Sequence, residues 1–441
     1  MKLIKHIIFI DCDENEMLML NSLNGLMDKI SYETYETLLK WQKCENIFPE
    51  GNFEQTLHNI LKNRGYLVHG HDEESAIKNE LIKKLRMNHA KQKVTRKHLT
   101  FVMTYDCNFR CQYCFEGENH IKKDVITPTQ VDAALKFAGK ELESIGLFGG
   151  EPLLPSTMSS LMYLTSKAAD KTYNITTNGY YLLEFFDVLS KVKVSDVMVT
   201  LDGDEKTHDS RRFLANGEPT YQKIMIGIQK YIENGIPICI RINVDKSNLE
   251  EIKKLRETLL VKFNEYRNLL TFEIQSLFGT SYDEKTKIVD ALYASDIEHS
   301  PEERLRRNRM MGKFSPLINA VTINSPMKPV YSFCQAHHNS LLLDPYGDLY
   351  PCMPAVGTEE LAVGTYYPDI RFKENSIYNR NIESIPECRE CIYSLLCGGG
   401  CPLALQSYED VLKPVCFCVH EQIHNTLPGF YKKKTEAAHR I

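Results

Sequence analysis

The chain has 441 residues and a formal net charge of −5; 43% of its residues are hydrophobic and 25% are charged. This length exceeds one ordinary hydrophobic core and fits two or three domains of a folded protein. The small net charge argues against a nucleic-acid partner, and without an apolar run of about 18 residues no membrane span is expected. The apolar start turns acidic at Asp11 and Asp13 and shows no small-residue cleavage site, so we expect a cytoplasmic protein.

Residues 1–90 are predicted to form a first unit of short strands and helices. Segments 4–10 and 16–23 have strand-like composition, and segments 32–44 and 52–63 have helical patterns. This content and size favour a small winged-helix-like α+β module. A basic helical stretch at 74–97 is expected to link the module to the rest of the chain.

From residue 98 the pattern changes to an alternation of strands and helices. Strands are expected at 98–104, 145–148, 173–176, 197–201, 237–244 and 270–275, and helices at 128–142, 161–169, 182–189, 221–234 and 249–259. Such β/α repeats predict a parallel sheet with crossover helices. The six expected strands fit a partial (β/α)6 TIM-like barrel at 98–280 better than a closed eight-stranded one. The predicted fold class is therefore α/β.

Regular elements become scarce after the barrel. Residues 281–333 are polar and are predicted to form a bridge, and residues 421–441 a C-terminal tail. Cysteine spacing dominates residues 334–420. We expect this segment to be a cysteine-rich iron–sulfur domain, held by metal rather than by a large core.

Cysteine usage is the most informative part of the composition. Of the 14 cysteines, Cys12, Cys44 and Cys239 stand alone, and the other 11 fall into two clusters, at 107–114 and 334–418. In a chain without an export signal, such clustering favours metal ligation over disulfides. The isolated cysteines are expected to be inert thiols.

The first cluster, Cys107, Cys111 and Cys114, has the spacing C-x3-C-x2-C directly after the first barrel strand. Three thiolates on one loop can bind three irons of a [4Fe–4S] cube and leave the fourth iron open. An open coordination position is what catalysis at a metal requires. A zinc loop is the alternative, but zinc sites usually pair one C-x-x-C with a second. We therefore predict a catalytic [4Fe–4S] cluster.

Further motifs follow the later strands at their carboxyl ends, where parallel β/α sheets place their sites. They are Gly149-Gly150-Glu151-Pro152, Thr176-Thr177-Asn178-Gly179, and Thr200-Leu201-Asp202-Gly203 with His208-Asp209-Ser210-Arg211-Arg212 behind it. Arg241 and Asn243 share one face of the next strand because side chains alternate. Together with the three cysteines, this series resembles the radical S-adenosylmethionine (SAM) superfamily.

The resemblance implies that the open iron chelates the amino and carboxylate groups of SAM, and that reduction cleaves SAM to a 5′-deoxyadenosyl radical. It implies aromatic contacts with adenine and polar contacts with the methionyl group. A purely structural role is the alternative for each polar residue. The implied SAM-binding residues are Tyr113, Phe115, Gly149, Gly150, Glu151, Thr177, Asn178, Thr200, Arg212, Arg241 and Asn243.

The second cluster runs Cys334-x12-Gly347-x4-Cys352, Cys388-x2-Cys391-x5-Cys397-x3-Cys401, then Cys416 and Cys418. It resembles the SPASM extension of radical SAM enzymes, which implies two auxiliary [4Fe–4S] clusters. The implied distal ligands are Cys388, Cys391 and Cys397 with Cys416 or Cys418, and the implied proximal ligands are Cys334, Cys352 and Cys401. Cys416 is slightly favoured over Cys418 because Pro414 lies just before it. The fourth proximal iron is open or bound by another group, such as a peptide thiolate, and zinc is again the alternative metal.

SPASM proteins mostly modify peptides, which implies that this chain is a maturase of ribosomally made precursor peptides. The segment 17–25 resembles the opening of the leader-binding modules of such maturases, and an exposed strand edge would bind the leader. A capping module without a ligand is the alternative. The implied partners are a precursor peptide with a leader and an electron donor, either a reductase with flavodoxin or a ferredoxin. The expected product is a thioether or a carbon–carbon crosslink.

Three other functions stay open. Anaerobic sulfatase maturases, which make formylglycine, are similar but carry an aspartate after the G-x4-C cysteine, where this chain has Met353. A non-catalytic iron–sulfur electron carrier would not need the SAM motifs. A radical SAM enzyme acting on a small molecule would not need a peptide-binding module.

Overall fold

The computed structural model describes residues 1–13, 16–91, 96–245, 247–277, 326–333, 341–373, 377, 380–401, 403, 412–416, 420, 423–424 and 427–428. Most of the predicted bridge and tail, and also Cys334 and Cys418, lie outside the described residues. The chain divides into two compact units. The N-terminal unit comprises Met1–Lys93, Met311–Cys334 and Tyr378–Ile441, and the barrel unit comprises Val94–Met310 and Gln335–Ile377.

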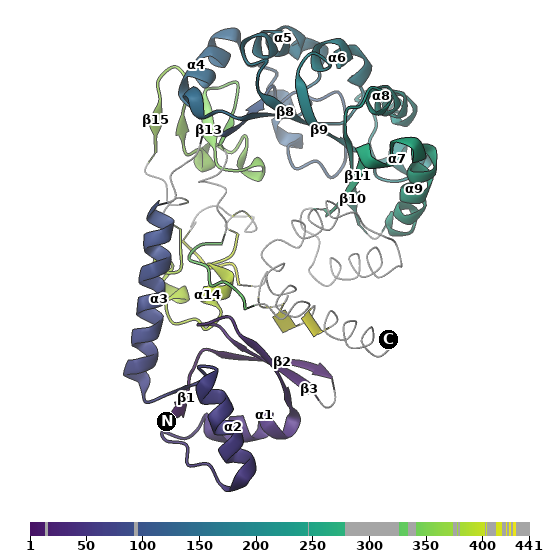
Figure 1. Cartoon of the computed structure of the whole chain (residues 1–441). Coiled ribbons are helices and arrows are strands. Elements are labelled where there is room, and N and C mark those ends of the chain that lie inside the picture. The colour runs from purple at the N-terminus through teal and green to yellow at the C-terminus, as the bar shows by residue number, and fades with distance from the viewer. Residues whose placement is uncertain are drawn as a thin grey trace. The chain divides into compact units, whose positions relative to one another are not determined.

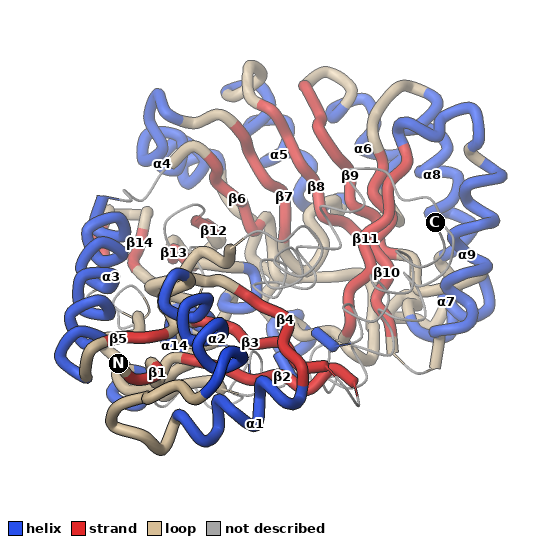
Figure 2. Tube along the Cα trace, turned by 60° about the horizontal axis from the view of Figure 1, so that its bottom comes forward, coloured by secondary structure: helices blue, strands red, loops and turns tan. Residues whose placement is uncertain are grey.

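The barrel unit is built on one sheet in the order β11-β10-β9-β8-β7-β6-β12-β13-β14-β15. Its first six strands in the chain run parallel to one another and lie side by side in Figure 2. They are β6 (His98–Val102), β7 (Ser144–Phe148), β8 (Thr172–Thr177), β9 (Lys193–Thr200), β10 (Ile238–Val244) and β11 (Leu270–Ser276). The predicted α/β fold with a parallel sheet is confirmed, and the sheet fits a partial TIM-like barrel.

Helices connect these strands and pack against one another, α4 on α5, α5 on α6, and α8 on both α6 and α7 (Figure 1). They are α4 (Pro128–Ala138), α5 (Met158–Lys167), α6 (Leu182–Leu189), α7 (Glu205–Arg211), α8 (Tyr221–Glu233) and α9 (Leu249–Lys262). Local sequence explains where α4 begins, because Thr127 and Gln130 form a capping box ahead of Pro128. β7 is buried over four of its five residues, as expected of a strand covered on both faces, whereas β8 and β10 also carry polar residues.

Single 3-10 turns complete the described elements. They are η1 (Gly117–Ile121), η2 (Gly139–Glu141), η3 (Pro155–Thr157), η4 (Asn264–Leu269), η6 (Met353–Ala355), η7 (Glu359–Leu361) and η8 (Pro386–Cys388). Among the described residues, no helix combines the length and apolar character that a bilayer crossing requires.

Four short strands extend the sheet beyond β6: β12 (Leu341–Leu343), β13 (Asp348–Tyr350), β14 (Gly364–Thr365) and β15 (Arg371–Phe372). β12 pairs parallel with β6, and the rest are antiparallel. The buried Asp344 anchors the extension, because its carboxylate accepts the Tyr105 hydroxyl at 2.9 Å and the Tyr346 and Asp348 amides at 3.0 and 2.8 Å. The segment predicted as one cysteine-rich domain is thus shared: its described residues 341–373 belong to the barrel unit and 380–401 to the N-terminal unit.

The N-terminal unit contains an antiparallel sheet in the order β2-β3-β4 and a two-stranded pair, β1-β5. Its elements are β1 (Lys2–Leu3), β2 (Ile7–Asp13), β3 (Glu16–Asn21), β4 (Met27–Ser31), α1 (Tyr32–Trp41), α2 (Gly51–Asn63), β5 (Leu67–Val68), α3 (His71–Lys91) and α14 (Ser394–Cys397). The strand expected at 4–10 begins only at Ile7, as β2, and a separate short strand, β1, precedes the expected range. The reason is Glu74, whose carboxylate accepts the Lys5 and His6 amides at 2.7 and 3.2 Å and so interrupts strand pairing.

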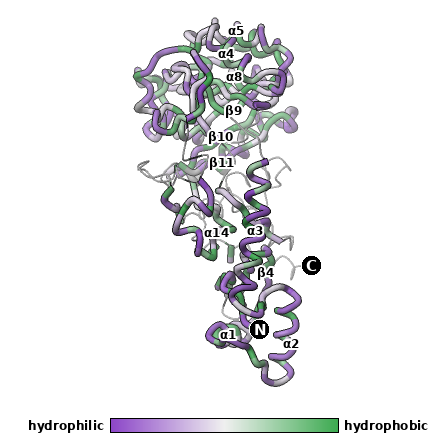
Figure 3. The backbone as a smooth tube through the Cα atoms, turned by 90° about the vertical axis from the view of Figure 1, so that its left-hand side faces the viewer, coloured by the Kyte–Doolittle hydropathy of each residue, from purple (hydrophilic) through white to green (hydrophobic). Residues whose placement is uncertain are grey.

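The hydrophobic core of the N-terminal unit joins parts of the chain that are distant in sequence. Leu38, Trp41 and Tyr66 pack in one cluster with Ile385 and Leu395. α3, predicted as a linker, contributes Leu81, Ile82 and Leu85 to this cluster, although Figure 3 shows it as hydrophilic along most of its length. Residues 380–401, predicted to be held by metal, are therefore also held by apolar packing.

Candidate active site

A cavity of about 350 Å³ lies in the barrel unit at the carboxyl ends of the parallel strands. The structure brings together around it all of the residues that the sequence predicts for the first cluster and for SAM. They are Cys107, Cys111, Tyr113, Cys114, Phe115, Gly149, Gly150, Glu151, Thr177, Asn178, Thr200, Arg212, Arg241 and Asn243. The cavity is the candidate active site.

The cysteine loop follows β6 and presents its thiols to the cavity. The Phe109 amide donates to Cys107 Sγ at 3.4 Å, the Asn178 side chain approaches the same sulfur at 3.9 Å, and His120 Nε2 lies 3.8 Å from Cys114 Sγ. Burial raises the pKa of all three thiols, that of Cys114 to about 11. Thiolates at these positions therefore require a bound cation.

Gly149 and Gly150 allow the segment after β7 to pack directly on the cysteine loop. A Cβ atom at Gly150 would collide with the carbonyl oxygens of Tyr105 and Asp106, and one at Gly149 with that of Thr104. The Gly150 and Glu151 amides donate to the Thr104 and Asp106 carbonyls at 3.0 and 2.9 Å. The glycines are thus required by contact between two backbone segments, in addition to the approach to a ligand that the sequence predicts.

Glu151 is buried at the cavity wall, with 1% of its surface exposed. Its carboxylate accepts the Thr177 hydroxyl at 2.6 Å, the Asn178 amide at 2.7 Å and the Leu153 amide at 2.9 Å. Burial outweighs these donors and raises the pKa of Glu151 to about 7. A cationic group in the cavity would restore its ordinary ionised state.

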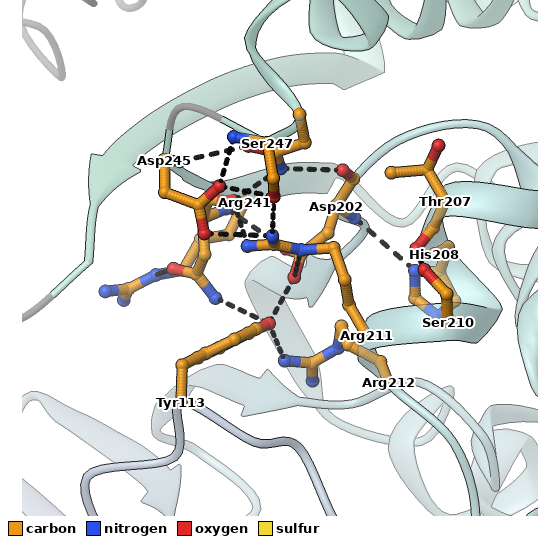
Figure 4. A network of polar contacts seen from close by, with 12 residues as sticks. Tyr113, Asp202, Thr207, His208, Ser210, Arg211, Arg212, Arg241, Asp245 and Ser247 are labelled. Atoms are coloured by element: carbon orange, nitrogen blue, oxygen red, sulfur yellow. Dashed lines mark hydrogen bonds and ion pairs between the residues drawn. The ribbon is translucent and has the colours of Figure 1, made fainter.

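Tyr113 stands at the centre of a polar network (Figure 4). Its hydroxyl donates to Asp202 Oδ2 and accepts from Arg212 Nη1 at 2.8 Å and from Asn243 Nδ2 at 3.4 Å. Asp202 is fully buried, and its second oxygen accepts the Asn243 amide at 3.2 Å. The ring that the sequence assigns to adenine is therefore fixed at its far end by hydrogen bonds to three other segments.

Comparison with known proteins decides the family of this unit. Residues 101–259, which span β6 to α9, match the radical SAM superfamily. The chain contains a radical SAM domain. The family implies a [4Fe–4S] cluster and SAM, so the cavity can be tested for both.

Two relatives illustrate the range of proteins that the chain resembles. GTP 3′,8-cyclase of Actinobacillus pleuropneumoniae serotype 3 (strain JL03) is 29% identical over 145 residues, which are 31% of this chain and 41% of that protein. The chain thus spans less than half the length of this relative. Radical SAM cyclopropyl synthase TigE of Paramaledivibacter caminithermalis is 21% identical over 387 residues, 80% of this chain and 79% of its own length.

Two solved structures share the fold. Native anSMEcpe with bound AdoMet has a TM-score of 0.56 and 18% identity, and the likeness covers 78% of this chain and all of that one. Streptococcus suis SuiB bound to precursor peptide SuiA has a TM-score of 0.53 and 16% identity, covering 95% of this chain and 99% of that one. The second likeness extends beyond the radical SAM domain to most of the N-terminal unit.

The residues present fit the two implied groups. Three thiols on one loop, one buried and two partly buried, with nitrogen groups close to two of the sulfurs, suit a cluster. Arg212 lines the cavity, and its guanidinium suits the carboxylate of the methionyl group. Glu151, buried and acidic, suits the ammonium group of the same methionyl moiety.

Sequence reasoning missed several residues of this site. The sequence identifies Asp202 and Arg211 only as members of a motif, although their side chains form part of the hydrogen-bond network around Tyr113. His120 and Gln275 line the cavity, and no spacing pattern singles them out. Met353 also lines it with Pro354, which brings the residue after Cys352 to the active site.

A second cysteine site lies in the N-terminal unit. Cys388, Cys391, Cys397 and Cys416 line one cavity of about 160 Å³ together with Tyr393 and His420. Burial, and then the neighbouring thiols, raise the pKa of Cys388 to about 12, so the thiols lie close enough to interact. The structure thus gathers the predicted distal ligands, with Cys416 in the contested position and Cys418 outside the described residues.

The predicted proximal ligands are divided between the units. Cys352 belongs to the barrel unit, Cys401 to the N-terminal unit, and Cys334 is outside the described residues. The proximal cluster therefore stays a prediction.

Proposed function

We propose that this chain is a radical SAM maturase that takes a hydrogen atom from a ribosomally made precursor peptide and forms an oxidative crosslink, either a thioether or a carbon–carbon bond. The observation that carries the proposal is the four-cysteine site of the N-terminal unit. A crosslink removes one hydrogen atom and one proton from the peptide and leaves one electron to be accepted. A chain that has both a SAM cavity and a second site for an iron–sulfur cluster can remove the hydrogen atom and accept the electron.

The cavity residues have distinct roles in this proposal. Cys107, Cys111 and Cys114 hold the catalytic cluster, Glu151 receives the ammonium group of SAM and Arg212 its carboxylate. When bound, the groups supply a 5′-deoxyadenosyl radical at the barrel and an electron acceptor at an auxiliary site.

The N-terminal unit is proposed to bind the leader of the precursor. In its sheet, β2 and β4 each pair with β3 alone among the described strands, so each has an edge that an extended peptide can join. The fold likeness to SuiB, solved with its precursor peptide, supports a peptide partner of this kind. A reductase with flavodoxin, or a ferredoxin, is proposed as the electron donor.

Met353 argues against the formylglycine alternative. It occupies the position of the aspartate base in the resemblance to sulfatase maturases, and it lines the active-site cavity. A thioether side chain cannot accept a proton from a substrate thiol or hydroxyl at neutral pH. An electron carrier is disfavoured because it needs no SAM cavity.

The test uses the full chain, reconstituted anaerobically, with SAM, dithionite and a candidate precursor peptide, read by mass spectrometry. The proposal predicts a peptide that has lost two hydrogens per crosslink. A cysteine sulfur replaced by oxygen would instead identify formylglycine. The variant Cys391→Ala should still cleave SAM but lose crosslinking, whereas equal crosslinking by this variant would contradict the role of the four-cysteine site.

A further inference from the structure

Two adjacent arginines at the end of α7 have different tasks. Arg212 lines the cavity and donates to Tyr113. Arg211 does not line it and lies behind the wall, with 12% of its side chain exposed. Figure 4 shows the two guanidinium groups on either side of the Tyr113 hydroxyl.

Arg211 neutralises Asp202. Its Nε lies 3.3 Å from Asp202 Oδ2, the oxygen that also accepts the Tyr113 hydroxyl. Asp202 has no exposed side-chain surface, and a buried carboxylate requires a paired cation. The other arginine joined to this carboxylate is Arg212, through the Tyr113 hydroxyl.

Arg211 is held in place by the loop after β10. Its Nη1 donates to Asp245 Oδ2 at 2.9 Å and to Ser247 Oγ at 2.8 Å, while its Cζ lies 5.2 Å from the centroid of the Tyr113 ring. This arrangement fixes the guanidinium between two carboxylates. The Arg211 guanidinium is therefore occupied by contacts within the protein and does not donate to a ligand.

From these contacts we infer that Arg211 is a positioning residue that keeps Arg212 free for the ligand. By satisfying Asp202, Arg211 prevents that carboxylate from drawing the Arg212 guanidinium toward itself. Arg212 then keeps its guanidinium at the cavity wall, where it can pair with the carboxylate of SAM. This inference rests on the SAM binding contained in the proposed function.

The test measures the dissociation constant of radiolabelled SAM by equilibrium dialysis on the anaerobically reconstituted full chain without reductant. Arg211→Met should weaken SAM binding by at least about tenfold, a typical coupling between linked sites. Arg211→Lys should bind with intermediate affinity, because a lysine can pair with Asp202 but lacks the planar fork. Lys206→Met, an exposed residue of the same helix, is the matched control and should bind as the wild type does.

The deciding variant is the double substitution Arg211→Met with Asp202→Asn. If Arg211 acts by neutralising Asp202, removing the competing charge should recover most of the lost affinity. A loss that Asp202→Asn does not recover, or no loss at all, overturns the inference. If Arg211→Met does not yield folded, iron-loaded protein, Arg211→Lys with and without Asp202→Asn answers the same question. A wild-type protein that holds its cluster yet binds no SAM would instead refute the proposed function.

Discussion

Gly150 shows how one missing side chain supports the active site. The space that a Cβ would need is filled by the carbonyl oxygens of Tyr105 and Asp106, next to the first cluster ligand. The GGEP segment and the cysteine loop are therefore mutually dependent. The sequence motif alone indicates ligand contact and does not reveal this packing.

Gly150→Ala should destabilise the protein by about 1–3 kcal/mol through overpacking and displace the cysteine loop. We expect most of the iron of the catalytic site to be lost on reconstitution, as measured by iron content and by electron paramagnetic resonance. Gly70→Ala is the control, because a Cβ there meets no atom within 4 Å. Normal iron content in Gly150→Ala would show that the loop tolerates the displacement.

Cys416 is a second residue whose role can be separated from that of its neighbour. It lines the four-cysteine cavity with Cys388, Cys391 and Cys397. Cys416→Ala should therefore lose the iron of one auxiliary cluster, while Cys418→Ala should retain it. The reverse result, by iron analysis of the two variants, would assign the ligand to Cys418.

At the scale of elements, the β/α alternation could be read from the sequence because the strands carry buried apolar residues and most of the helices have one buried apolar face. All six parallel strands occur within a few residues of the expected positions. Other elements lack that signal. β4 has a single buried residue, Ile30, and α7 is short and polar. The sequence does not predict the extension from β12 to β15, because cysteine spacing is the dominant pattern of that segment and its strands are only two or three residues long.

The late start of β2, at Ile7, depends on a residue far along the chain, which a local pattern cannot reveal. Glu74 at the start of α3 accepts the Lys5 and His6 amides and the His6 Nδ1 group at 2.7 Å. The active-site network likewise depends on residues that are distant in sequence, because Tyr113, Asp202 and Asp245 come from separate loops. The sequence could identify most of the residues around the cavity but not their mutual contacts.

Replacing Glu74 tests its contacts with Lys5 and His6. Glu74→Ala leaves three donors without an acceptor and should lower the free energy of unfolding by about 2–4 kcal/mol at pH 7. Glu80→Ala removes an exposed pair with Lys84 and should cost less than about 0.5 kcal/mol. Equal effects of the two variants in denaturant titrations would contradict the role of Glu74.

The contribution of the Glu74 contacts to the free energy of unfolding should depend on pH. Burial opposes ionisation of Glu74, but the His6 imidazole and the Lys5 amide outweigh it and hold the pKa of Glu74 below its ordinary value. A lowered acid pKa stabilises the fold above the ordinary value and loses that effect as the pH falls through the lowered one. The stability difference between wild type and Glu74→Ala should therefore shrink in acid. A difference that is constant with pH would exclude an ionic contribution.

At the scale of the whole molecule, the two units are stabilised in different ways. The barrel unit is organised by a continuous sheet, whereas residues 380–401 contain only short elements and three of the four cysteines of the second site. If the proposed auxiliary cluster binds there, we expect its metal to contribute more to the order of this segment than the catalytic cluster contributes to the barrel.

Removal of iron should affect the units unequally. In hydrogen–deuterium exchange of the full chain, residues 380–401 should lose protection in the apo protein, while β6 to β11 should keep most of theirs. Uniform loss of protection in both units would show that the barrel also requires its metal to fold.

The central claim is that the barrel cavity performs radical SAM chemistry. The most direct measurement is 5′-deoxyadenosine formation from SAM by the anaerobically reconstituted chain under dithionite, with Cys111→Ala as the control. We predict 5′-deoxyadenosine from the wild type and none from the variant. No 5′-deoxyadenosine from wild-type protein shown to hold its clusters would contradict the account.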